Sequence, residues 1–135
     1  MARCPKILTG FVLAVCAIVL GGAAAGLDIN GAWVTDLDIC DKVLVKRGAR
    51  TEMAPNSDLY GSGFVVDGAS IRGKIASCKI TSRRENGSTV HIQAACATDI
   101  LVSANQFSLT MVRDGELVRA YPGIPEMDTS YFRCP

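Results

Sequence analysis

Cysteine is the residue type whose spacing says most about the chemistry of this chain. After residue 25 the sequence has four cysteines: Cys40, Cys78, Cys96 and Cys134. Zinc sites take cysteines in close pairs such as C-x2-C, whereas the gaps here are 37, 17 and 37 residues. An even number of cysteines in an exported chain is typical of disulfides. We therefore predict two disulfides and no metal site.

His91 is the only histidine and the first candidate for catalysis. A nucleophilic serine or cysteine needs a histidine beside it and an acid that orients that histidine. Ser82, Ser88 and Asp99 are near in sequence, but their spacing matches no known nucleophile motif. We expect an ordinary surface histidine. The alternative is a small hydrolase or lyase in which folding brings carboxylates to His91.

Three carboxylates, Asp36, Asp38 and Asp41, gather around Cys40. Calcium loops need dense oxygen ligands in a defined order, and glycosidases need two carboxylates that flank a cleft. Neither pattern is present in this segment. We expect these residues to cap a short turn before Cys40, and we predict no cofactor.

Residues 1–25 have the pattern of a secretory signal peptide. Arg3 and Lys6 precede an apolar run from Ile7 to Leu20, and three alanines stand before Gly26. The run is shorter than the roughly 20 residues of a membrane-spanning helix. We therefore expect a mature chain of residues 26–135 that is periplasmic or secreted, has no transmembrane segment and forms a single barrel-like domain. Without Arg3 and Lys6 the net charge is about −1, which gives no electrostatic reason to bind nucleic acid.

Three hairpin signals, Asp67-Gly68, Asn86-Gly87 and Asp114-Gly115, divide the chain after residue 60. Helix is expected only in short turns near Asp36–Asp41 and Thr98–Asn105. The predicted strands are 30–35, 42–46, 62–66, 70–76, 78–85, 89–97, 106–113 and 116–121, with a further piece at 130–134. This pattern predicts an all-β fold. We expect a small antiparallel meander of seven or eight strands that forms a closed or partly closed, disulfide-stapled barrel.

The register of the middle hairpin bears on the disulfides. A two-residue Asn86-Gly87 turn would put the apolar faces of the two strands out of phase, so we predict a three-residue loop, Asn86-Gly87-Ser88. Cys78 then lies opposite Cys96, and Ile80 opposite Ala94. This register favours the pair Cys78–Cys96 and leaves Cys40–Cys134, with the other two connectivities still open.

For the third hairpin, a two-residue Asp114-Gly115 turn predicts that Arg113 faces Glu116. The same register pairs Met111 with Val118 and Leu109 with Ala120, which gives one apolar face.

Gly31-Ala32-Trp33 at the start of the first strand resembles the G-x-W motif of lipocalins. The resemblance implies that Trp33 closes one end of the barrel and packs under a late arginine, Arg119 or Arg133. An ordinary core tryptophan with no arginine nearby is the alternative. The motif followed by Cys40 is also similar to bacterial inhibitors of secreted metalloproteases, whose inhibitory trunk would correspond to residues 26–30.

The whole mature chain resembles small exported proteins of unknown function from Gram-negative bacteria. The matching stretches are Gly31–Asp36, Cys40–Lys42, Ser57–Gly61 and Tyr131–Pro135. This resemblance implies no activity. We therefore expect a monomeric, non-enzymatic binding module, an inhibitor or an envelope accessory, whose partner is an unknown protein or small-molecule ligand.

Overall fold

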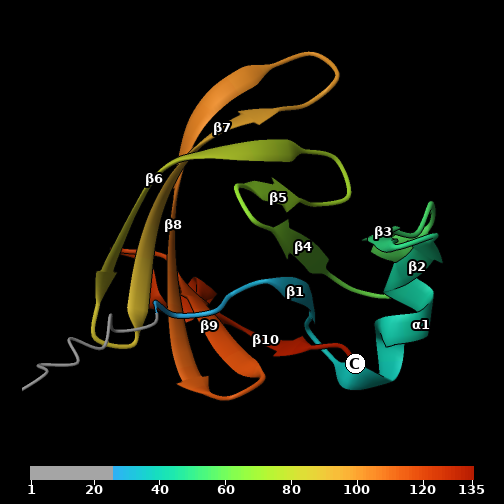
Figure 1. The fold of residues 1–135 in the computed structure, drawn as a ribbon, viewed down its shortest axis with the longest axis horizontal. Helices are drawn as coiled ribbons and strands as arrows, with labels where there is room; N and C mark the ends of the chain where they lie inside the picture. Colours follow the sequence, from blue (N-terminus) through green and yellow to red (C-terminus); the bar gives the residue numbers. More distant parts are fainter. Residues whose placement is uncertain (1–25) are drawn as a thin grey trace, which may run out of the picture.

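The computed structural model describes residues 26–135, and the predicted signal peptide, residues 1–25, lies outside the described residues. Eight strands form one closed antiparallel barrel, and two more form a separate hairpin beside it (Figure 1). The strands are β1 (Gly31–Val34), β2 (Leu44–Arg47), β3 (Arg50–Met53), β4 (Gly63–Asp67), β5 (Ser70–Arg72), β6 (Ser77–Asn86), β7 (Thr89–Ala97), β8 (Val102–Arg113), β9 (Glu116–Ala120) and β10 (Thr129–Arg133). The predicted fold class, an all-β disulfide-stapled barrel, is confirmed.

The barrel is a meander, because each strand from β4 to β10 pairs with the next one along the chain. β1 closes the cylinder by pairing with both β4 and β10. The turns β4–β5, β6–β7 and β8–β9 therefore lie at one end of the barrel, and the connections β5–β6, β7–β8 and β9–β10 lie at the other. Figure 1 shows the β6–β7 and β8–β9 turns at the bottom and the β7–β8 connection at the top.

Glycine makes the tight turns possible at all three predicted hairpins. Gly68, Gly87 and Gly115 each have a φ between 58° and 78°, a left-handed conformation that costs glycine little. Gly48 has the same conformation between β2 and β3, a hairpin that we did not predict.

The predicted three-residue loop of the middle hairpin is wrong. Asn86 pairs with Thr89 across a two-residue turn, Gly87-Ser88. The register then shifts at Thr81, so that Ile80 still faces Ala94 and Cys78 still faces Cys96. A β-bulge, which places two residues opposite one, thus brings the apolar faces of the two strands back into phase, the effect that the predicted three-residue loop would have had.

The predicted register of the third hairpin is also wrong beyond its turn. Arg113 does face Glu116, but the register shifts at Val112. Met111 consequently pairs with Leu117, and Leu109 pairs with Arg119. A one-residue shift exchanges the two faces of a strand, so the inner face of β9 carries Leu117 and Arg119 instead of Val118 and Ala120.

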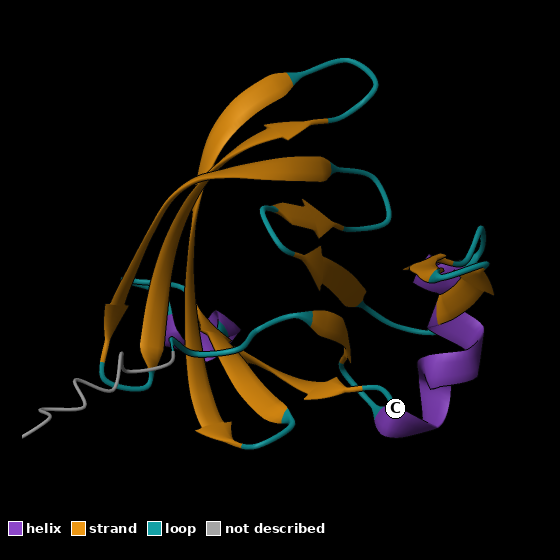
Figure 2. Cartoon of the chain, viewed as in Figure 1, coloured by secondary structure: helices purple, strands orange, loops and turns teal. Residues whose placement is uncertain are grey.

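The helical segments lie in the connections (Figure 2). They are η1 (Leu37–Ile39), α1 (Cys40–Val43), η2 (Ser57–Leu59) and η3 (Pro125–Met127). The short turn expected near Asp36–Asp41 is confirmed, but the one expected at Thr98–Asn105 is wrong because β8 begins at Val102. Ser103 and Asn105 pair with β7 there, and this strand pairing overrides the weak local preference for a helical turn. The predicted strand 42–46 begins at Leu44, and the strand 70–76 ends at Arg72.

One hydrophobic core lies inside the barrel, and a small buried contact lies outside its wall. The core contains Trp33, Ile92 and Leu117, which are almost fully buried. Outside the wall, Val34 of β1 and Val43 of α1 are both inaccessible to solvent, and both side chains lie against Gly63, where a Cβ would leave no room.

Both predicted disulfides are confirmed. Cys78–Cys96 joins β6 to β7, and Cys40–Cys134 ties α1 to the residue after β10. Disulfides of this kind indicate an oxidising compartment. Among residues 26–135, no helix is long and apolar enough to cross a membrane.

Candidate functional site

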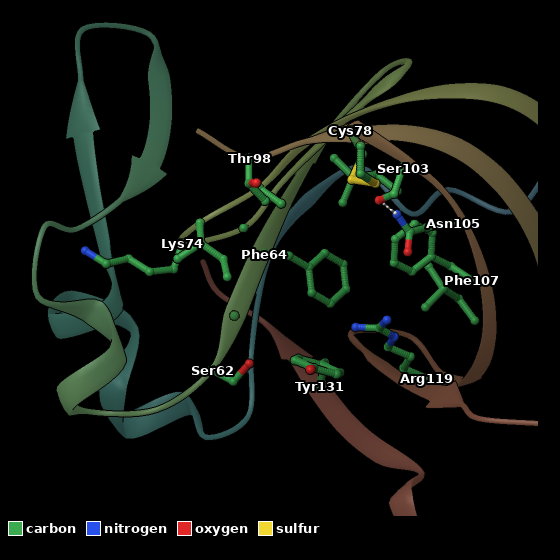
Figure 3. Close-up of a pocket in the computed structure, with 17 residues that line it drawn as sticks. Ser62, Phe64, Lys74, Cys78, Thr98, Ser103, Asn105, Phe107, Arg119 and Tyr131 are labelled. Atoms are coloured by element: carbon green, nitrogen blue, oxygen red, sulfur yellow. Dashed lines mark hydrogen bonds between the residues drawn. A yellow bond between two sulfur atoms is a disulfide. The ribbon is translucent and has the colours of Figure 1, made fainter. Parts of the chain in front are cut away.

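A cavity of about 350 Å³ opens inside the barrel at the end formed by the β5–β6 and β7–β8 connections. Gly73–Ala76 and Thr98 form its rim, and the disulfide Cys78–Cys96 forms part of its wall. Figure 3 shows Phe64, Phe107 and Tyr131 around the centre of this space. A volume of this size lies in the range of small-molecule sites, which are mostly apolar with a few placed polar groups.

The alternation of β8 builds one wall of the cavity. Ser103, Asn105, Phe107 and Leu109 occupy every second position and all line it, since residues two apart share a face of a strand. The side chain of Asn105 donates a hydrogen bond to Ser103 Oγ at 2.9 Å. This strand therefore supplies a polar patch near the rim and an apolar surface further in.

Arg119 lies on the neighbouring strand β9, and the bulge at Val112 turns it to the inner face. Its direct partner, Leu109, is buried in the barrel, and the two side chains share the inner face. The Arg119 guanidinium carbon lies 4.8 Å from the ring centres of both Phe107 and Tyr121. Within residues 26–135 this guanidinium forms no ion pair.

The other predicted arginine, Arg133, belongs to the opposite end of the barrel. Its guanidinium carbon lies 4.6 Å from the Trp33 ring centre, and its Nη2 donates to the carbonyl oxygen of Asp28 at 2.7 Å. Trp33 is fully buried, and its Nε1 donates to the carbonyl oxygen of Ile29 at 2.9 Å. Of the two candidate arginines, Arg133 contacts the indole, whereas Arg119 lines the cavity.

Residues 26–30, here called the N-terminal strap, cover that opposite end. Leu27 N donates to Glu85 Oε1 at 3.0 Å, close to the β6–β7 turn. Asn30 Oδ1 accepts from Gly68 N at 2.8 Å in the β4–β5 turn. The strap therefore connects the strand turns at the end away from the cavity, and Gly31 follows it at a φ of 130°, where Arg133 packs against its Cα.

The carboxylate of Asp28 fixes the shape of the strap. It accepts hydrogen bonds from the backbone N–H of Asn30 at 3.0 Å and from the Asn30 side-chain amide at 3.1 Å. These bonds, the backbone one first, lower the pKa of Asp28 from its ordinary value, and the charges of Arg133 and Arg83 add to the effect. Desolvation acts in the opposite direction.

His91 lies on the outer, exposed face of β7 and has no carboxylate beside it in the described part of the chain. Its Nδ1 is 3.0 Å from Ser108 Oγ on β8. The shallow hollow around it, about 200 Å³, is lined by Arg84 and by glutamines and serines of neighbouring strands, with no acid among its residues. Ser82 lines the same hollow as His91, but Ser88 and Asp99 do not, so the fold does not assemble a catalytic group with an orienting acid there.

Of the three acidic residues near Cys40, Asp36 has the predicted capping role. Asp36 caps η1, with its side chain accepting a hydrogen bond from Asp38 N at 2.9 Å. No cluster of three metal-binding side chains occurs among residues 26–135.

The residues of the cavity are the part that sequence reasoning missed. The alternation of Phe107, Leu109 and Met111 indicated an inner face, but not that this face leaves an open volume. A signal was present in Arg119, the one charge between the apolar residues Val118 and Ala120.

No family model, curated protein or solved structure matches the chain. The resemblances to lipocalins, to metalloprotease inhibitors and to exported proteins of Gram-negative bacteria therefore rest on the sequence motifs alone. The fold and the site define only a structural class. The protein is a closed eight-stranded meander barrel with two disulfides and an internal cavity that is open at one end.

Proposed function

We propose that this protein is a periplasmic or secreted binding module that holds a small, mostly apolar molecule inside its barrel. The cavity is the observation that carries the proposal. Its apolar walls include Phe64, Ile71, Phe107, Leu109 and Tyr131. Because the cavity is open to water, an apolar ligand that covers these side chains removes their surface from water, which is favourable.

The architecture of the two ends supports this proposal. The buried Trp33, Arg133 and the N-terminal strap cover one end, as the lipocalin resemblance implies. The other end has a rim of loop residues, where Ile75 is 80% exposed although it borders the cavity. This end therefore offers an apolar molecule an entrance bordered by an apolar side chain.

The two disulfides support an exported location. Cys40–Cys134 and Cys78–Cys96 require an oxidising environment to form and persist. The signal-peptide pattern of residues 1–25 supports the same conclusion from the sequence.

The enzymatic alternative has less support. His91 and Ser108 are within hydrogen-bonding distance, but they lie on the outer face of the sheet and outside the cavity. A histidine that activates a serine needs an orienting acid as well, and the hollow around His91 contains none.

Binding of N-phenyl-1-naphthylamine, an uncharged probe that fluoresces in apolar sites, tests the proposal. We expect saturable binding at one site per chain. Ser103→Phe places a ring in the cavity and should abolish most of the fluorescence. Ala104→Phe is the matched control, because Ala104 is exposed on the outer face of the same strand. Equal binding by both variants would contradict the proposal.

A further inference from the structure

Arg119 is an unusual residue for the inner wall of a small barrel. Charged side chains are rarely placed in a barrel interior without a partner, because removing a charge from water is costly. Arg119 nevertheless shares the inner face with Leu109, which is 3% exposed. Figure 3 shows its guanidinium pointing from β9 towards the space between Phe107 and Tyr131.

No acidic side chain of the described residues compensates this charge. Of the residues that line the cavity, Lys74 and Arg119 are basic and none is acidic. Lys74 points away from the cavity in Figure 3 and lies 3.8 Å from Asp58 Oδ1. Arg119 is thus the one cation among these lining residues that has no ionic partner within residues 26–135.

Two aromatic side chains lie beside the guanidinium of Arg119. Phe107 and Tyr121 lie against it with ring centres at 4.8 Å. Rings contact a guanidinium through its face, whereas its N–H groups point outward in its own plane. The edge of the group therefore remains available for two parallel hydrogen bonds to a planar anion, which is the geometry that carboxylates offer.

The position of Arg119 along β9 suggests how such a ligand would lie. β9 runs from the β8–β9 turn towards the open end, and Arg119 is its fourth residue of five. Leu109, the direct partner of Arg119, and the nearby Phe107 line the cavity beside it. A carboxylate paired with Arg119 would therefore leave the rest of the ligand against these apolar side chains.

We propose that the ligand is a carboxylate with a compact apolar body, aromatic or short-chain, and that Arg119 pairs with its carboxylate. This inference rests on the proposed function and specifies it. Because the cavity is about 350 Å³, it suits a molecule with one or two rings better than a long lipid chain.

Competition against N-phenyl-1-naphthylamine by 2-naphthoate and 2-naphthamide tests the inference. The two competitors have the same ring system, and only the first is an anion. Since a hydrogen bond to a charged group contributes about 1.5–3 kcal/mol, we expect 2-naphthoate to compete at a concentration at least about tenfold lower. In Arg119→Met the ratio of the concentrations at which 2-naphthamide and 2-naphthoate compete should fall to about one, while the neutral probe still binds.

Arg50→Gln is the charge-matched control, because Arg50 is exposed on the β2–β3 hairpin. It should keep the wild-type preference. Retention of the preference in Arg119→Met, or its absence from the wild type, would overturn the carboxylate inference and leave the proposed function standing. Failure of the neutral probe itself to bind the wild type would overturn both.

Discussion

Leu109 on β8 pairs directly with Arg119 on β9, and the two side chains share the inner face of the barrel. The register shift at Val112 creates this pairing. In a regular ladder Ala120 would face Leu109, and Arg119 would lie on the outer face. One inserted residue thus brings a basic group to the inner face, as β-bulges near functional sites often re-aim a side chain.

The two arginines should differ in their effect on stability. Arg119→Met removes an unpaired charge and two cation–π contacts of about 0.5–1 kcal/mol each, so we expect a free energy of unfolding within about 1 kcal/mol of wild type. Arg133→Met removes the hydrogen bond to Asp28 O and the stack on Trp33, and should cost about 2 kcal/mol. Urea denaturation measures both. An Arg119→Met variant that loses more than Arg133→Met would make Arg119 a structural residue.

The indole of Trp33 should report burial directly, because it is the only tryptophan. We expect blue-shifted emission from the wild type. Trp33→Phe loses the hydrogen bond to Ile29 O and the contact with Arg133, so the free energy of unfolding should fall by about 1–3 kcal/mol. Tyr60→Phe, a change at an exposed ring, serves as the control. Solvent-like emission with unchanged stability would contradict this description of the closed end.

The two disulfides should contribute unequally. Cys40–Cys134 closes a sequence separation of 94 residues, and Cys78–Cys96 one of 18. In the loop-entropy account these bridges stabilise the fold by about 4–5 and about 3 kcal/mol. The double variant Cys40→Ser/Cys134→Ser should therefore unfold at lower urea concentration than Cys78→Ser/Cys96→Ser. The reverse order would indicate that local strand pairing, and not chain entropy, determines how much each disulfide stabilises the fold.

Acid should loosen the N-terminal strap. The folded pKa of Asp28 is lowered, chiefly by the Asn30 backbone hydrogen bond, so the charged carboxylate favours the folded state. Its contribution is complete above the ordinary aspartate pKa of about 3.9 and is lost as the pH falls through the lower folded value. Asp28→Asn should flatten the pH dependence of unfolding in that window. An unchanged dependence would show that Asp28 does not contribute to it.

The sequence was sufficient for the barrel strands in outline, for the three glycine hairpins and for the disulfides, because these follow from local turn chemistry and from alternation. Cys78 lies opposite Cys96 even though the loop that we predicted between them is wrong, since the bulge at Thr81 compensates for the shorter turn. The β2–β3 hairpin was missed because its turn residue, Gly48, is not part of an Asn-Gly or Asp-Gly pair.

The site was not predictable to the same degree. Arg119 reaches the interior only through the bulge at Val112, and bulges leave little trace in a single sequence because either face of β9 contains apolar residues. The cavity depends on how much volume the inward side chains leave unfilled. That quantity is a property of the closed barrel and not of any one strand.

A crystal structure of the protein with 2-naphthoate tests the central claim most directly. The account predicts the naphthalene ring inside the barrel against Phe107 and Leu109, with both carboxylate oxygens at hydrogen-bonding distance from the Arg119 guanidinium, about 2.7–2.9 Å. An empty cavity at saturating 2-naphthoate, or 2-naphthoate bound on the outer face beside His91, would contradict it.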